Sequence, residues 1–102
     1  MATLELTKLH CHRKKDVIGK DEPRIKVDGV PVWNGVMEKD SSRDLRPTSV
    51  VFDNTTRVKL EEMNNQDAKQ IGADVVIRES GNPDSVHFKT SGAWYELYFT
   101  VA

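Results

Sequence analysis

The segment IKVDGVPVW, residues 25–33, places two alternating apolar runs on either side of an Asp-Gly pair. Asp-Gly between alternating runs is typical of a β-hairpin, because both central positions of a type I′ turn need positive φ. A two-residue turn predicts that Val27 faces Val30 and that Ile25 faces Val32, all on one face. This predicted hairpin indicates a β protein.

The opposite face of this hairpin then carries two cations and an aromatic ring. Trp33 is expected to lie across from Arg24 and beside Lys26. Pro31 has no backbone N–H. In this register the side of residue 31 that would carry the N–H points away from residues 24–27. The far side of residues 30–33 is therefore expected to be a sheet edge or a bulge.

A second hairpin is predicted around Ser91-Gly92, near the end of the sequence. Phe88 faces Tyr95 and Val86 faces Leu97 in this register, which gives one apolar face. The opposite face carries His87, Lys89, Trp94, Glu96 and Tyr98.

Period-two alternation continues elsewhere. Leu4 and Leu6 are out of phase with Leu9 and Cys11, so a bulge is expected near residues 7–8. A middle hairpin is expected to pair residues 50–52 with 58–60 through Asp53-Asn54-Thr55, with Asn54 or its neighbour left-handed.

Residues 60–71 carry few apolar side chains and predict a strand end followed by a loop, and residues 71–77 add a strand. The result is an all-β chain, predicted as an antiparallel β-sandwich of about eight strands.

The composition limits the function classes. The 102 residues suit a single domain, 1–102, and the net charge of -1 makes nucleic acid an unlikely partner. One cysteine excludes an intrachain disulfide. A signal-peptide pattern and a spanning run of ~20 apolar residues are both lacking, so the expected location is the cytoplasm, with signal-independent export left open.

Two stretches carry a resemblance to a known family. Residues 16–27 (DVIGKDEPRIKV) resemble the first calcium loop of the protein kinase C conserved-region-two type ("C-two") domain, and residues 58–63 (VKLEEM) with 70–72 (QIG) resemble its later loop. The resemblance implies an eight-stranded sandwich that docks on acidic phospholipid with calcium.

Carried over by position, the resemblance implies the calcium ligands Asp16, Asp21, Glu22, Glu61 and Asp67. Met63 and Lys69 stand where the family has acids, and neither side chain offers a hard oxygen ligand. Weak or absent calcium dependence is therefore expected.

Other candidate chemistry is sparse. His10 and His12 point to one side of a strand and could chelate zinc or copper, with His87 as the remaining imidazole. The favoured alternative has Cys11 as a core residue with both histidines outside. No nucleophile elbow, split carboxylate pair or phosphate loop is present, so no enzyme is expected.

The basic run HCHRKK, residues 10–15, includes Arg13, Lys14 and Lys15. It predicts a solvated loop, with a lipid-headgroup or RNA contact as the alternative.

These observations favour a non-catalytic binding module. The first hypothesis is membrane or phospholipid binding through end loops. The second is a protein–protein interaction or assembly subunit, including a homo-oligomer, that docks through an exposed aromatic sheet face. A weaker third is a lectin-like or toxin-associated module. The predicted binding surface consists of Trp33, Trp94, Tyr98, Arg24, Lys26 and Lys89.

Overall fold

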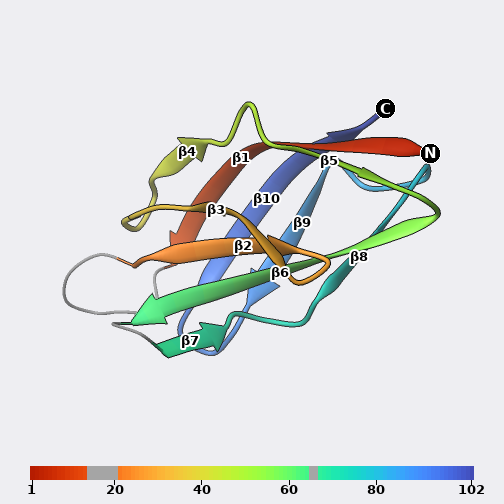
Figure 1. The fold of residues 1–102 in the computed structure, drawn as a ribbon. Coiled ribbons are helices and arrows are strands. Elements are labelled where there is room, and N and C mark those ends of the chain that lie inside the picture. Colours follow the sequence, from red (N-terminus) through yellow and green to blue (C-terminus); the bar gives the residue numbers. More distant parts are fainter. Residues whose placement is uncertain (14–20, 65–66) are drawn as a thin grey trace.

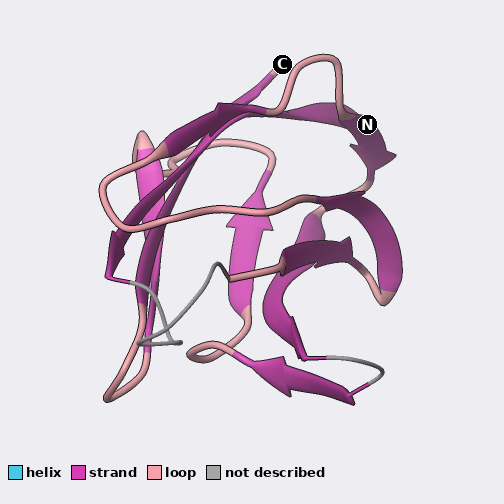
Figure 2. Ribbon diagram, turned by 90° about the vertical axis from the view of Figure 1, so that its left-hand side faces the viewer, coloured by secondary structure: helices cyan, strands magenta, loops and turns pink. Residues whose placement is uncertain are grey.

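The computed structural model describes residues 1–13, 21–64 and 67–102, and these residues form strands and loops without a helix (Figure 2). The ten strands in them are β1 (Ala2–Arg13), β2 (Pro23–Val27), β3 (Val30–Asn34), β4 (Ser42–Asp44), β5 (Ser49–Phe52), β6 (Thr55–Asn64), β7 (Asp67–Gln70), β8 (Val75–Arg78), β9 (Ser85–Lys89) and β10 (Trp94–Val101). Accordingly, no helix of the described part is long and apolar enough to cross a membrane.

The described strands form two antiparallel sheets that pack face to face (Figure 1). One sheet has the order β4-β1-β10-β9, with β5 also paired to β1. The other has the order β3-β2-β6-β7, with β8 also paired to β6. The predicted all-β antiparallel sandwich is confirmed, with ten described strands in place of about eight.

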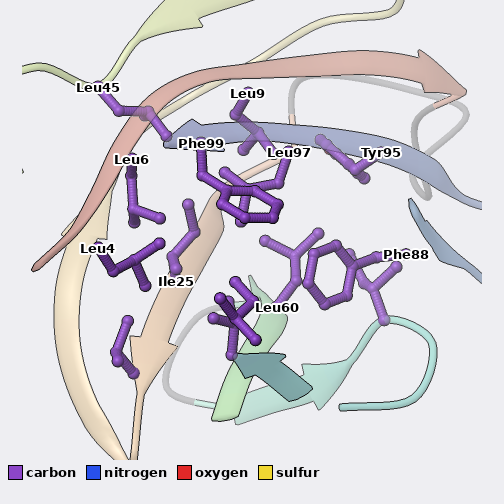
Figure 3. Close-up of a cluster of buried hydrophobic side chains, with 14 of the residues drawn as sticks. Leu4, Leu6, Leu9, Ile25, Leu45, Leu60, Phe88, Tyr95, Leu97 and Phe99 are labelled. Carbon is purple, nitrogen blue, oxygen red and sulfur yellow. The ribbon is translucent and has the colours of Figure 1, made fainter. Parts of the chain in front are cut away.

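The core lies between the sheets, where side chains from both layers point toward one another (Figure 3). Leu4 and Leu6 are buried, and so are Leu9 and Cys11, although the two pairs are out of phase in sequence. A register shift between Leu6 and Lys8 restores the inward alternation, which confirms the predicted bulge.

The β2–β3 hairpin has the predicted turn, because Asp28 and Gly29 have φ of 49° and 82° and Val27 pairs with Val30. The predicted register holds as far as Lys26, which pairs with Pro31, and is wrong beyond it. A shift between Ile25 and Lys26 places Ile25 opposite Trp33, so Trp33 is half-buried against the core.

The predicted irregularity at Pro31 explains this outcome. β3 is an edge strand, and the register shift adds a residue next to the proline, which turns the following side chain to the other face.

The β9–β10 hairpin is confirmed in register. Phe88 pairs with Tyr95 and Val86 with Leu97, and Trp94 lies across from Lys89. Phe88, Tyr95 and Leu97 are fully buried.

The predicted middle hairpin is wrong, because β5 pairs with β1 whereas β6 pairs with β2, β7 and β8. Asn54 has φ of 64°, as expected, but the turn carries the chain from one sheet to the other. Phe52, Val58 and Leu60 all reach the core, and apolar alternation does not distinguish a hairpin from such a corner.

The segment after Leu60 also differs from its prediction. β6 continues to Asn64 and β7 returns along it, where a loop was expected. Ile71 is buried, and the strand predicted for residues 71–77 begins at Val75 and ends at Arg78.

Candidate docking face on the β1–β10–β9 sheet

The outer face of β1, β10 and β9 gathers most of the aromatic and imidazole side chains outside the core. Outer positions of β10 alternate with the buried ones, and the two neighbouring strands place their own outer residues beside them. We call this surface the histidine–tryptophan face; it consists of Lys8, His10, His12, Ser85, His87, Lys89, Trp94, Glu96 and Tyr98.

Trp94 is the first residue of β10, the strand that lies between β1 and β9 on this face. The Nζ atom of Lys89 is 4.0 Å from the indole centroid, which confirms the predicted cation–π contact. The His12 ring comes from the strand on the other side and stacks on the indole at 4.2 Å with an interplanar angle of 25°.

A second aromatic–cation pair extends the same surface. Tyr98 lies four residues further along β10 than Trp94, and the Nζ atom of Lys8 is 4.3 Å from its ring centroid. Tyr98 is half-buried whereas Lys8 is exposed, so the ammonium group covers the ring from the solvent side.

Glu96 lies between these aromatic pairs and is the acidic centre of the face. Its Oε1 atom accepts a hydrogen bond from His12 Nε2 at 2.9 Å, and its Oε2 atom accepts one from Ser85 Oγ at 2.5 Å. His87 Nε2 is 3.7 Å from the same carboxylate. The Ser85 and His12 hydrogen bonds outweigh the effect of burial and lower the pKa of Glu96 to about 2.

The hydrogen bonds of His87 define its tautomer. Trp94 Nε1–H donates to His87 Nδ1 at 3.0 Å, and only an unprotonated ring nitrogen accepts such a bond. The proton of the neutral ring is therefore on Nε2, on the side of Glu96.

The same tautomer argues against a metal site on this face. A metal ligand needs an unprotonated nitrogen, and Nδ1 of His87 already accepts from the indole. His10 is engaged as well, because its Nδ1 is 2.6 Å from Ser42 Oγ. Among the described residues, no group of three or more His, Cys, Asp or Glu side chains could hold a metal ion.

The predicted binding surface is divided between the two sheets. Trp94, Tyr98 and Lys89 lie together on the histidine–tryptophan face, whereas Arg24 and Lys26 lie on the other sheet. Trp33 is also there, with the guanidinium of Arg43 5.7 Å from its ring centroid.

Arg24 and Lys26 are engaged by a single acid. Glu61 Oε1 accepts hydrogen bonds from Arg24 at 2.8 and 3.1 Å and is 3.3 Å from Lys26 Nζ. Burial raises the pKa of Glu61, but the hydrogen bonds from Arg24 and Lys26 outweigh it and lower the value. Both cations are therefore paired with an acid of the same sheet, although its single negative charge offsets only one of them.

The calcium candidates are not gathered into one carboxylate cluster within the described ranges. Asp21 is fully buried and accepts a hydrogen bond from the Tyr95 hydroxyl at 2.5 Å. Burial, followed by this contact with Asp21, raises the pKa of Tyr95. Glu22 and Asp67 are exposed, the latter on β7.

Three predicted site residues, Asp16, Lys14 and Lys15, lie outside the described residues. Arg13 is described, and it is exposed at the end of β1, across from Trp94. Weak or absent calcium binding stays a prediction.

Sequence reasoning did not connect the three histidines with Trp94. Parity already placed His87 and Trp94 on one outer face, and it placed His10 and His12 opposite Cys11. The missing information was the pairing of β1 with β10, which joins segments more than eighty residues apart.

Comparison of the chain with protein-family models, with curated proteins and with solved structures finds no match. Its function therefore has to be inferred from the geometry and charge of this face.

Proposed function

We propose that this chain is a non-catalytic binding module that docks an acidic segment of another protein on the histidine–tryptophan face. The observation that carries the proposal is the arrangement of Trp94, held between Lys89 and His12 on an open sheet face. Tryptophan, tyrosine and arginine dominate the energetic centres of protein interfaces.

The face is organised before any partner arrives. Trp94 contacts side chains from both neighbouring strands, Lys89 on β9 and His12 on β1. Side chains ordered in advance lose little conformational entropy on binding, so more of the contact energy appears as affinity.

The charge of the face favours an acidic partner. Lys8, Lys89 and Arg13 are exposed, and none of them forms an ion pair with a carboxylate among the described residues. The acid of the face, Glu96, is only 14% exposed and already accepts from His12 and Ser85. Unpaired surface cations around a tryptophan complement carboxylates and steer their approach.

A protein segment fits this face better than a membrane surface. Recognition of acidic lipid usually needs a cluster of about four to eight Lys or Arg residues. The face supplies Lys8 and Lys89, with Arg13 at its border, on regular strand positions. Phospholipid binding is therefore the alternative that the binding experiment below has to distinguish from peptide binding.

The proposal is tested by fluorescence anisotropy with a labelled peptide of alternating Asp and Glu residues at low ionic strength. Trp94→Ala should weaken binding tenfold or more, which corresponds to about 1.4 kcal/mol. Lys59→Gln is the matched control, because it removes a half-buried cation from the other sheet and should change affinity by less than about twofold.

Two outcomes would contradict the proposal. One is equal affinity of the Trp94→Ala and wild-type proteins for the peptide. The other is binding to phosphatidylserine vesicles, with or without calcium, when the peptide does not bind.

A further inference from the structure

We infer that His87 is a proton-operated latch on Trp94: a proton taken up at Nδ1 releases the indole N–H to an acidic partner, so that docking strengthens in mild acid. The partner in this inference rests on the proposed function. The latch itself concerns residues within the chain.

The latch follows from the donor role of the Trp94 indole N–H and the acceptor role of His87 Nδ1. Trp94 Nε1–H donates to His87 Nδ1 at 3.0 Å, which requires that nitrogen to be unprotonated. Both nitrogens of a protonated imidazole are donors, so the indole N–H and the ring N–H would then face each other. Protonation of His87 must therefore end this hydrogen bond.

The charged and titratable groups around His87 come from three strands. From β10, Glu96 lies 3.7 Å from Nε2 and stays ionised in mild acid, because its pKa is about 2. From β9, Lys89 lies over the same indole that His87 contacts. From β1, His12 stacks on this indole, donates to Glu96 and touches His10 edge-on at 4.5 Å.

Solvent reaches the latch directly, because the His87 side chain is 48% exposed. Histidine is the side chain that ordinarily changes charge between about pH 5 and pH 8. Gain of a proton would add positive charge beside Glu96 and leave the indole N–H in need of a new acceptor. A carboxylate of the partner supplies that acceptor with a charge-assisted hydrogen bond.

The first experiment follows the latch without any partner. The indole ¹H–¹⁵N resonance of Trp94, identified by its loss in Trp94→Phe, is recorded between about pH 8 and about pH 5.5. It should move in the wild type and in Lys59→Gln, the control variant on the other sheet. It should stay in place in His87→Asn, whose amide oxygen is bonded to Cγ, as Nδ1 is, and accepts the indole N–H at every pH.

The second experiment measures the affinity of the Asp/Glu peptide at the same two pH values and constant ionic strength. The peptide carboxylates are ionised at both. Wild type and Lys59→Gln should bind roughly fivefold more tightly in acid, as expected for one added surface charge, and His87→Asn should change by less than about twofold.

The outcomes separate the two proposals. A Trp94 resonance that does not move with pH overturns the latch, and so does a full acid gain in His87→Asn. A resonance that moves while the peptide fails to bind at either pH supports the latch and overturns the proposed docking function.

Discussion

At the scale of single residues, Glu96 organises the histidine–tryptophan face. Three side chains from two strands converge on its carboxylate: His12, Ser85 and His87. Their contacts hold the pKa of Glu96 at about 2, which is below the ordinary value of 4.5 for a glutamate. A carboxylate whose pKa is lower in the folded protein than in the unfolded chain stabilises the native state at any pH above its unfolded-state pKa. This stabilisation is lost as the pH falls through the folded-state pKa.

Glu96→Gln should therefore change how stability depends on pH. Wild-type protein should lose on the order of 2 kcal/mol through this group as the pH falls from about 5 to about 2, and the variant should lack this loss. Urea melts across this range measure it. Asp44→Asn is the control, because this exposed acid pairs only with Arg46 in the contacts described and should leave the pH profile close to that of the wild type. Parallel pH profiles of wild type and Glu96→Gln would contradict the prediction.

At the scale of elements, the β2–β3 turn shows what a glycine contributes through backbone conformation alone. Gly29 has φ of 82° and a methyl group added there would meet nothing within 4 Å, so crowding plays no part. Gly92, in the β9–β10 turn, is equally open but does not have a left-handed φ.

Gly29→Ala should destabilise the protein by about 1–2 kcal/mol, because the left-handed conformation is sterically unfavourable for a residue with a Cβ atom. Gly92→Ala should stay within about 0.5 kcal/mol of wild type or add slight stability. Denaturant melts of the two single variants decide the point. Equal losses in both would contradict the prediction, because only Gly29 has a left-handed φ.

The elements also show where prediction from sequence succeeded. The turns Asp28-Gly29 and Ser91-Gly92 were predictable because their chemistry is local, and the register next to each turn followed from it. Trp33 was misplaced because one bulge beside Pro31 reverses the parity of everything beyond it. The candidate site shows the same limit: strand parity identified the outer residues, whereas their grouping depends on a non-local strand pairing.

At the scale of the whole molecule, the first and last described strands lie side by side (Figure 1). Thr3 and Ala102 exchange two backbone hydrogen bonds of 2.8 and 3.0 Å. Chain ends this close can be joined by a short linker without disturbing the sheet.

A circular permutant that joins residues 1 and 102 through a short glycine linker should keep the fold and the histidine–tryptophan face. New ends opened in the loop between Asp53 and Thr55 test this, because that exposed corner connects the two sheets without pairing β5 to β6. Circular dichroism and peptide binding like those of the wild type are expected. A permutant that folds but does not bind would show that the face needs the original ends.

The pairing of β1 with β10 also determines when the face exists during folding. Its contacts join the two extremes of the sequence, so most of the chain-closure entropy must be lost before they form. Such topologies fold slowly, on the order of milliseconds to seconds. His12 and Trp94 meet only after this long-range closure, so the surface proposed for docking does not exist before β1 and β10 have paired. Recruitment of a partner would thereby be restricted to molecules that have completed folding.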